Sequence, residues 1–393
     1  MTFDVCVVGG AGHVGAPLAI VFADRGMRTL VLDKNEAAMS ELRSGRLPFL
    51  EEGGEPPLRR ALAAGCLDTT ADPSRVRGVP ILVITIGTPV DEFQNPRVDV
   101  IRRCVDELMP YLSSEQAIVL RSTVSPGVTE YLHQYLRRHG LETGVAFCPE
   151  RVVQGKAILE IGSLAQIVSG TTPEAEEKAA ALFARVAPRI VRMSPREAEY
   201  AKLISNAYRY ITFAAANQFY MMVQGAGLDY ARVAAGLKEE YPRMRDLPGP
   251  GFAAGPCLMK DTVQLMAFDQ LSFPLGRAAV TINEGLPNFI VEEIARRRDL
   301  EKTRVGILGM AFKADIDDTR ESLSYKLGKI LRFRGATVLY SDEYAKDPTF
   351  VPKEELVRGS DVVVVGVPHR AYRTLRIPDG VDTIDLWGAL PRG

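Results

Sequence analysis

Short apolar runs alternate with longer amphipathic stretches along the first half of the chain. Glycine and proline punctuate the segments between these runs. This alternation is the pattern of a parallel β-sheet covered by helices. The strands that it predicts are Val5–Val8, Thr29–Leu32, Ile81–Ile84, Ala117–Leu120, Val145–Phe147 and Gln166–Ser169.

A helical pattern begins at Pro195. Ser194 can cap this helix, Pro195 fits its first turn, and Glu197 completes a capping box. Apolar residues then recur at helical spacing as far as Gly225, which predicts a single long helix. Such a helix would form a spine between two domains and a surface for dimerisation. The cluster Pro248–Gly251 interrupts the helical region, and helical patterns resume after it.

The last part of the chain returns to the alternation of strands and helices. Its predicted strands are Arg304–Leu308, Thr337–Tyr340, Asp361–Val365 and Thr383–Asp385. The predicted fold class is therefore α/β, with two Rossmann-like α/β domains joined by a long helical spine. The predicted domains are residues 1–194, 195–300 and 301–393.

Composition narrows the class of protein without changing this picture. The 393 residues are 46% hydrophobic and 25% charged, which is ordinary for a globular enzyme of two or three domains. The 48 basic and 49 acidic residues leave a formal charge of −1, too little to hold nucleic acid by its field. There is no basic leader before the first strand and no apolar run near the length of a membrane span. We therefore expect a cytoplasmic protein that binds neither nucleic acid nor membrane.

The five cysteines are an odd number without paired spacing, which favours a reducing compartment over a disulfide framework. Four of them read as ordinary packing residues: Cys6, Cys66, Cys104 and Cys148. His133 and His139 lack the spacing of metal ligands, so no metal site is expected.

A glycine fingerprint follows the first predicted strand. Gly10, Gly12 and Gly15 form G-x-G-x-x-G between that strand and a helix rich in small residues. These glycines allow a tight turn and let a pyrophosphate approach the helix N-terminus. Asp33 ends the second strand 18 residues after Gly15, where a carboxylate binds ribose hydroxyls and repels a 2′-phosphate. The pattern predicts an NAD site rather than an NADP site.

The second α/β domain has a related turn at Gly306–Lys313 that lacks the full fingerprint. We do not expect a second NAD site there. Lys313 and Arg320 could instead bind the phosphates of another nucleotide. The alternative is a surface αβ unit with charged loops, and the residues alone leave both open.

Cys257 differs from the other cysteines because it follows a Gly/Pro loop at the expected start of a helix. The helix dipole and Lys260 would both stabilise its thiolate. Asp261 would then lie one turn later on the same face of the helix, which makes a nucleophile and carboxylate pair. Taken alone, Cys257 could also be a small buried residue of a turn.

Six motifs occur in a characteristic order between about residue 5 and residue 370. They are the glycine fingerprint, Ser122–Gly127, Pro149–Arg151, Lys202–Arg209, the loop that ends at Cys257, and Phe312–Ser322. Together they resemble the UDP-glucose/GDP-mannose dehydrogenase family of nucleotide-sugar 6-dehydrogenases. The resemblance implies a four-electron oxidation of a sugar C6 hydroxymethyl to a carboxylate with two NAD⁺, through a thiohemiacetal and a thioester on Cys257.

The same resemblance implies roles for particular residues. Lys202 would stabilise oxyanions and Asn206 would position them, whereas Asp261 and Thr123 would order a water or the reacting hydroxyl. Glu150 would act as an acid/base group. The expected cofactor residues are Gly10, Gly12, His13, Val14, Gly15, Asp33, Lys34, Thr88, Thr123 and Arg320. The expected substrate residues are Glu150, Arg151, Val152, Lys202, Asn206, Arg209, Arg243, Gly251, Phe312 and Lys313, with Arg243 reaching a neighbouring subunit of a homodimer or higher oligomer.

The chain departs from the family pattern around the cysteine. Ala253 and Ala254 replace paired glycines, Pro256 replaces a serine or histidine, and Gln218 after Asn217 replaces a common acid. Methyl groups at the first two positions would narrow the room near the sugar.

Two segments favour the branch of the family that acts on UDP-N-acetylhexosamines over the UDP-glucose branch: Gly87–Pro96 and Pro248–Gly251. Two other readings stay open. One is a β-hydroxyacid-type dehydrogenase with a single hydride transfer, and the other is a non-catalytic protein that binds a nucleotide sugar.

Overall fold

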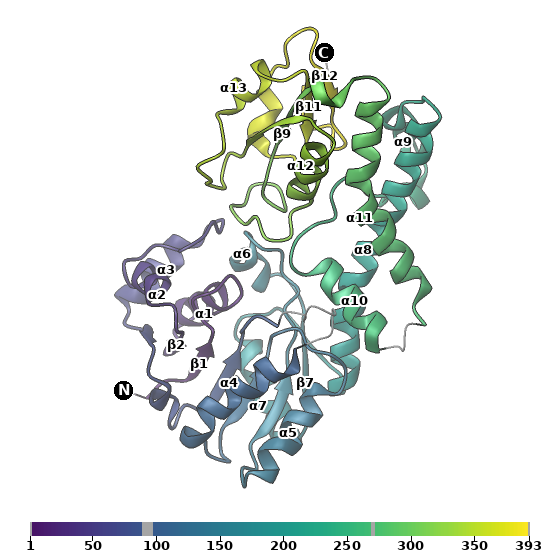
Figure 1. Cartoon of the computed structure of the whole chain (residues 1–393). Helices are drawn as coiled ribbons and strands as arrows, with labels where there is room; N and C mark the ends of the chain where they lie inside the picture. Colours follow the sequence, from purple (N-terminus) through teal and green to yellow (C-terminus); the bar gives the residue numbers. More distant parts are fainter. Residues whose placement is uncertain (1, 89–96, 269–271, 392–393) are drawn as a thin grey trace. The chain divides into compact units, whose positions relative to one another are not determined.

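The computed structural model describes residues 2–88, 97–268 and 272–391. The chain forms two compact units, Met1–Ser205 and Asn206–Gly393, which divide inside helix α8 (Pro195–Gly225) (Figure 1). Each unit has its own sheet and its own core. The division into residues 1–194, 195–300 and 301–393 stays a prediction.

The first unit contains an eight-stranded sheet in the order β3-β2-β1-β4-β5-β6-β7-β8. All neighbouring strands are parallel except β6 and β7, which are antiparallel. The strand order reverses between β1 and β4, and ligands of such sheets bind at this reversal. The strands are β1 (Val5–Val8), β2 (Thr29–Leu32), β3 (Leu67–Thr70), β4 (Ile81–Ile84), β5 (Ala117–Leu120), β6 (Gly144–Phe147), β7 (Gln166–Gly170) and β8 (Ile190–Arg192).

The six strands predicted for this half of the chain are confirmed, whereas β3 and β8 were not predicted. Helices cover both faces of the sheet. One hydrophobic core joins the sheet to α1, α2, α3 and α7, and the other joins it to α4 and α5. The helices are α1 (Gly15–Asp24), α2 (Glu36–Arg43), α3 (Glu55–Ala63), α4 (Val98–Leu108), α5 (Val128–Arg138), α6 (Ala157–Ile161) and α7 (Pro173–Ala184).

The long helix is confirmed, because α8 runs without a break from Pro195 to Gly225. Glu197 forms its half of the capping box by accepting the backbone N–H of Ser194 at 2.8 Å and the Ser194 hydroxyl at 2.7 Å. The Pro248–Gly251 segment is not helical, as predicted. Three more helices follow α8: α9 (Tyr230–Lys238), α10 (Leu258–Phe268) and α11 (Pro274–Ala295).

The second unit contains a four-stranded parallel sheet in the order β10-β9-β11-β12. Its strands agree with the prediction to within one residue at each end. One face packs on α11 and α12, and the other packs on α13 and Tyr372. The elements are β9 (Arg304–Leu308), α12 (Leu323–Phe333), β10 (Thr337–Ser341), α13 (Lys353–Arg358), β11 (Val362–Val365) and β12 (Asp382–Ile384).

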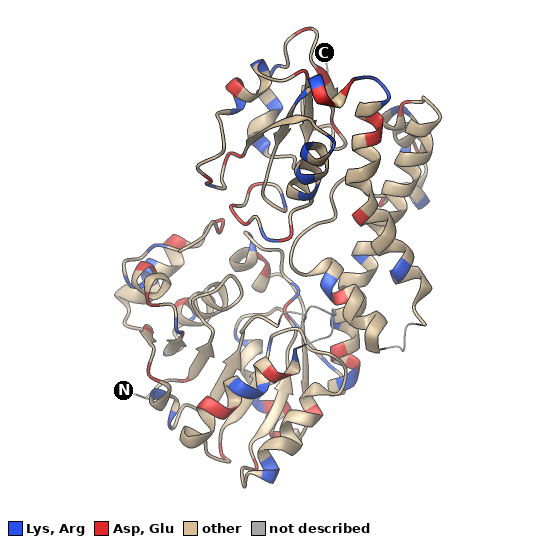
Figure 2. Ribbon diagram, viewed as in Figure 1, with Lys and Arg blue, Asp and Glu red and all other residues tan. Residues whose placement is uncertain are grey.

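Acidic and basic side chains are interspersed along the elements of both units, in keeping with the near-zero formal charge (Figure 2). Among the described residues, none of the helices combines the length and the apolar composition that crossing a membrane requires.

Candidate functional site

The three predicted glycines of the turn after β1 differ in the space around them. A Cβ atom on Gly10 would lie 2.6 Å from the carbonyl oxygen of Val7, and one on Gly15 would lie 2.5 Å from the Cα of Gly10. Packing within the protein therefore demands glycine at both positions. At Gly12, a Cβ would meet only the Gly9 oxygen at 3.7 Å. Because Gly12 is exposed and open, its missing side chain leaves room for a ligand at the N-terminus of α1, as a pyrophosphate requires.

Asp33 lies beside this turn at the end of β2. Its Oδ2 accepts the Ala11 N–H at 2.9 Å and its Oδ1 accepts the Asn35 N–H at 2.9 Å. The carboxylate is only half-buried, so its remaining lone pairs can accept ribose hydroxyls. Lys34 is exposed and pairs with Glu107 at 2.8 Å. The residues present therefore fit NAD at this strand end.

Two more predicted cofactor residues meet at the strand ends beside β1. The Thr88 hydroxyl donates to the Thr123 carbonyl oxygen at 2.6 Å, which joins the segments that follow β4 and β5. His13 lies inside the glycine turn, and its ring stacks on Phe49 with centroids 4.1 Å apart. Phe49 was not predicted from the sequence, because it belongs to a loop between α2 and α3 that has no nucleotide-binding motif.

The Glu150 carboxylate is held on both oxygens. Its Oε2 accepts Arg121 Nε at 2.8 Å, and its Oε1 accepts the backbone N–H groups of Arg151 at 2.7 Å and Val152 at 2.8 Å. Arg121 is fully buried, donates also to Gln166 at 3.0 Å, and lies over the Phe183 ring. The ion pair of Glu150 is therefore with Arg121, which the sequence analysis missed.

Lys202 is buried, and its Nζ donates to the Glu150 carbonyl oxygen at 2.5 Å. One turn earlier on α8, Glu199 accepts the Gly127 N–H at 2.6 Å and the Thr129 N–H at 2.8 Å. The N-terminal part of α8 is thus fixed to the start of α5. These contacts place the ammonium group of Lys202 next to the Pro149–Arg151 motif.

The second unit carries the cysteine. Cys257 is exposed and directly precedes α10, and its carbonyl oxygen accepts the Asp261 N–H at 2.9 Å. The expected place at the start of a helix is confirmed. By contrast, burial raises the pKa of the Cys6, Cys104 and Cys148 thiols to about 12, which keeps them protonated and unreactive.

Asp261 and Asn206 are in direct contact. Asn206 Nδ2 donates to Asp261 Oδ2 at 2.6 Å, and both side chains are buried. The other carboxylate oxygen, Oδ1, is buried and lies 3.1 Å from Lys260 Nζ without a hydrogen bond of its own. A buried oxygen with spare accepting capacity can order a hydroxyl or a water beside the cysteine loop.

The turn after β9 holds Phe312, Lys313 and Arg320 on one connected segment. Arg320 forms a bidentate pair with Asp318, with N–O distances of 2.6 to 3.1 Å. The pKa of Arg320 is raised above its ordinary value, first by the hydrogen bonds to Asp318 and more weakly by the charge of Cys257. Arg320, predicted at the cofactor, thus also lies within electrostatic reach of Cys257.

The loop before Cys257 explains two departures from the family pattern. Ala253 is buried in a cluster with Tyr210, Ala214 and Ala279, and Ala254 packs against the core of the second unit. The Ala253 side chain is therefore buried, whereas that of Ala254 is partly exposed. Gly251 lies against Trp387, whose ring carbons a Cβ on Gly251 would meet at 2.2 Å.

Two predicted substrate residues are exposed in the chain alone. Arg209 projects from α8, and Arg243 belongs to a short 3-10 helix, where its guanidinium lies over the Tyr241 ring. The structure does not bring Arg243 to the cysteine loop through any described hydrogen bond or ion pair. The segment 89–96, which contains most of the Gly87–Pro96 motif, lies outside the described residues.

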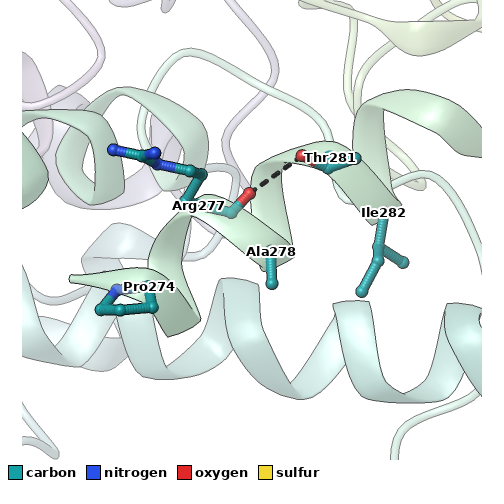
Figure 3. Close-up of a pocket in the computed structure, with 5 residues that line it drawn as sticks. All are labelled: Pro274, Arg277, Ala278, Thr281 and Ile282. Carbon is teal, nitrogen blue, oxygen red and sulfur yellow. Dashed lines mark hydrogen bonds between the residues drawn. The ribbon is translucent and has the colours of Figure 1, made fainter. Parts of the chain in front are cut away.

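A surface groove of about 410 Å³ lies along the first half of α11. It is lined by Pro274, Arg277, Ala278, Thr281 and Ile282, and the Thr281 hydroxyl is bonded back to the Arg277 carbonyl (Figure 3). None of these residues was predicted to bind or react. The groove is therefore lined by none of the predicted site residues.

Three domain models of one family match the chain in order. They are the NAD binding domain over residues 3–187, the central domain over residues 196–285 and the UDP binding domain over residues 306–388 of the UDP-glucose/GDP-mannose dehydrogenase family. The chain belongs to this family. The expected cofactor, NAD, is confirmed by the first of these domains.

Relatives with known names are similar to this chain over nearly its whole length. It is 28% identical to the UDP-N-acetyl-D-mannosamine dehydrogenase of Methanocaldococcus jannaschii, over 94% of this chain and 86% of that protein. It is also 28% identical to an NDP-N-acetyl-D-galactosaminuronic acid dehydrogenase of Ralstonia nicotianae, over 98% of this chain and 97% of that protein. The solved UDP-D-ManNAc dehydrogenase of Pyrococcus horikoshii has a TM-score of 0.91 at 26% identity, over 99% of this chain and 96% of that one.

Proposed function

We propose that this family member oxidises the C6 hydroxymethyl group of a nucleotide sugar to a carboxylate, with two NAD⁺ and a covalent intermediate on Cys257. One observation carries the proposal: an exposed cysteine precedes α10, and one turn into that helix Asp261 is bonded to Asn206. A simple one-step dehydrogenase needs no such nucleophile. The family domains and relatives supply the nucleotide-sugar class and NAD.

The covalent steps balance on the cysteine. NAD⁺ supplies the hydride acceptor in each of the two oxidations. The first oxidation removes a hydride, which is two electrons and a proton, from C6 and a second proton from the hydroxyl group, and it leaves an aldehyde. The Cys257 thiolate adds to the aldehyde carbon, and the resulting oxyanion takes up a proton to give a thiohemiacetal. The second oxidation gives a thioester, and water then breaks the carbon–sulfur bond to leave a carboxylate and the free thiol.

The buried polar residues fit supporting roles. Lys202 and Asn206 are four residues apart on α8, so they lie on the same face of that helix. We assign the ammonium of Lys202 to the oxyanions and the carboxamide of Asn206 to their positioning. Asp261 orders the hydrolytic water through Oδ1, which lies beside the Lys260 ammonium, and Thr123 orders the reacting hydroxyl.

Glu150 is assigned to acid/base work together with the positioning of Lys202, because its carbonyl oxygen accepts the Lys202 ammonium. A Glu150→Gln variant keeps this backbone carbonyl and removes only the ionisable carboxylate, so it tests the acid/base task. Loss of acid/base work changes the pH profile of kcat, and an unchanged profile would contradict the assignment.

The remaining expected contacts belong to the nucleotide sugar. We assign Lys313 to the diphosphate, with Phe312, Gly251, Arg151, Val152 and Arg209 as further substrate contacts, and Arg320 to the cofactor. The proposed sugar is a UDP-N-acetylhexosamine. Support comes from the names of the relatives, which are dehydrogenases of UDP-N-acetyl-D-mannosamine and of an NDP-N-acetylgalactosamine derivative.

We also propose that the protein works as a homodimer or a higher homo-oligomer. Four large apolar side chains of α8 are exposed: Ile204, Tyr208, Phe219 and Met222. Their spacing of 4, 11 and 3 residues puts them on one face of the helix, where a second copy would bury them. Arg243, also exposed, would reach the substrate of that copy. Sedimentation of wild type and Phe219→Asp measures whether this face makes the oligomer.

The deciding experiment counts NADH. Purified protein is incubated with NAD⁺ and a panel of UDP- and GDP-sugars, and NADH is followed together with product mass. Two NADH per sugar, a carboxylate product and strong impairment of Cys257→Ser are expected. Cys66→Ser, at a half-buried cysteine, is the matched control and keeps full activity. One NADH per sugar with an unaffected Cys257→Ser would establish the single-hydride alternative, and binding without NADH would establish the non-catalytic one.

A further inference from the structure

The buried side chain of Asn217 forms hydrogen bonds with Gly251, at the start of the loop that runs from Gly251 to Cys257 (the cysteine loop). Its side chain is fully buried on α8. Its Oδ1 accepts the Gly251 N–H at 2.7 Å, and its Nδ2 donates to the Gly251 carbonyl oxygen at 3.0 Å. One carboxamide thus satisfies both backbone groups of a single residue. This two-point contact fixes the position and the orientation of the peptide at Gly251.

A second buried carboxamide holds Asn217 in this orientation. Asn217 Nδ2 also donates to Asn283 Oδ1 at 2.9 Å, and Asn283 Nδ2 donates to the Tyr210 carbonyl oxygen at 3.0 Å. Asn283 is likewise fully buried, on α11. Because every donor and acceptor has one partner of the opposite kind, rotating either amide would place donors against donors. Two helices therefore define where Gly251 lies.

The opposite side of the loop is closed by the end of the chain and by the turn after β9. The Trp387 ring lies against Gly251, and its Nε1 donates to the Gly366 carbonyl oxygen at 3.1 Å. Nearer the cysteine, the Gly255 N–H donates to the Glu321 carbonyl oxygen at 3.2 Å, and the Phe312 ring covers Gly255. The loop is thus held at two points, six and two residues before Cys257.

We propose that Asn217 is a positioning residue for the Cys257 thiolate, and that it acts by fixing Gly251 between its carboxamide and the Trp387 ring. The inference rests on the proposed function for its catalytic consequence. Asn217 itself touches none of the proposed reacting groups. Its effect comes through the loop, because a nucleophile displaced by about 1 Å can react about 10²-fold more slowly.

The sharpest consequence concerns the aldehyde. In the wild type, a correctly placed thiolate captures the aldehyde before it leaves, and the NADH:sugar ratio is two. In Asn217→Ala, the loop loses its hydrogen bonds to the carboxamide and the thiolate is less well placed. Part of the aldehyde then dissociates before the thiolate captures it. The ratio then falls below two, and a hydrazine reagent traps aldehyde in solution. A purely structural role would lower the folded fraction and the total rate but leave the ratio at two.

The experiment compares wild type, Asn217→Ala, Asn217→Asp and Asn288→Ala, with thermal unfolding to match folded fractions. Asn217→Asp keeps the acceptor for the Gly251 N–H but loses both donors, so an intermediate aldehyde loss is expected. Asn288 is exposed on α11, and its alanine variant serves as the unchanged control. NAD⁺ affinity should be the same in all four proteins, since the glycine turn lies in the other unit.

A second readout needs no substrate. The rate of Cys257 alkylation by iodoacetamide, followed by mass spectrometry, should change severalfold in Asn217→Ala and stay at the wild-type value in Asn288→Ala. If the NADH:sugar ratio stays at two and the alkylation rate is unchanged, Asn217 is only a packing residue and the proposal is wrong. If the wild type itself gives one NADH per sugar, the proposed function fails, and the alkylation rate alone decides whether Asn217 positions the thiol.

Discussion

The two units build the same turn in two different ways. In the first, the Ala11 N–H after β1 donates to Asp33 Oδ2 at 2.9 Å; in the second, the Ala311 N–H after β9 donates to Asp342 Oδ2 at 2.9 Å. Asp33 is half-buried and can still reach a ligand. Asp342 is sealed, because the buried His369 approaches the same oxygen at 3.1 Å. One unit therefore leaves its strand-end carboxylate partly accessible, and the other buries it in a structural network.

The glycine at which a pyrophosphate is predicted to approach marks the same difference. Gly12 is open, and the third residue after Gly309 is Phe312, just as Gly12 is the third residue after Gly9. The Phe312 ring covers Gly255 of the cysteine loop instead of leaving space. The second turn thus contacts the loop that leads to Cys257. The family models describe the two domains as NAD binding and UDP binding.

Removing the two strand-end carboxylates in turn should have the largest effect on stability, and the loss should differ between the two units. Asp342 accepts the N–H groups of Met310, Ala311, Tyr344 and Ala345 in addition to His369. Asp342→Ala leaves these donors unpaired inside the protein and should lower the free energy of unfolding by about 3–5 kcal/mol.

Asp33→Ala is the matched change. It should lower the free energy of unfolding by only about 1 kcal/mol but weaken NAD⁺ binding strongly. Urea denaturation and calorimetric titration with NAD⁺ measure the two effects. Equal losses of stability in the two variants would contradict the distinction between a binding and a structural carboxylate.

Two glycines of the first turn test the same distinction at closer range. Gly15→Ala forces a Cβ to within 2.5 Å of backbone atoms and should cost about 1–3 kcal/mol of unfolding free energy. Gly12→Ala meets no close atom, so its unfolding free energy should stay within about 0.5 kcal/mol of wild type. NAD⁺ affinity should nevertheless fall in Gly12→Ala. If Gly12→Ala binds NAD⁺ normally, the pyrophosphate does not approach at Gly12.

The buried Asp342 carboxylate should make the unfolding free energy depend on pH in acid. Hydrogen bonding to His369 and to backbone N–H groups outweighs burial and lowers the pKa of Asp342 from 3.8 to about 2. A depressed folded-state pKa contributes stability that is present above pH 4 and is lost as pH falls towards 2. The contribution is about 2 kcal/mol in this window. In Asp342→Asn, the fall in unfolding free energy between pH 4 and 2 should be smaller by that amount, as measured by denaturant titration at each pH.

The sequence predicted those features that are local in the chain. Strands such as Val5–Val8 are continuous apolar runs and were found to the residue, whereas β3, Leu-Asp-Thr-Thr, and β8, Ile-Val-Arg, carry no such run and were missed. The glycine turn, α8 and the start of α10 were predicted for the same reason.

Contacts between distant residues were not predictable in this way. Arg121 meets Glu150 from 29 residues away, and Trp387 covers Gly251 from the far end of the chain. No spacing rule encodes these pairs, because they depend on how strands and loops pack. The packing partners of Ala253 show the same limit, because Tyr210, Ala214 and Ala279 come from distant parts of the chain.

The ion pairs of Lys34 and Glu343, the residues that follow the two strand-end aspartates, should show the smallest difference in stability between the two units. Lys34 pairs with Glu107 at 2.8 Å, with its side chain 83% exposed, whereas Glu343 pairs with Lys353 at 2.7 Å, with both side chains less than a quarter exposed. Solvent screens the first pair, so Lys34→Ala should change the unfolding free energy by less than about 0.5 kcal/mol. Lys353→Ala should cost more, because its apolar stem is also buried. Denaturation of both variants at low and high salt measures the difference. If Lys34→Ala lowers the unfolding free energy as much as Lys353→Ala, solvent exposure does not set the strength of these pairs. If Lys34→Ala abolishes NAD⁺ binding, Lys34 contacts the cofactor directly.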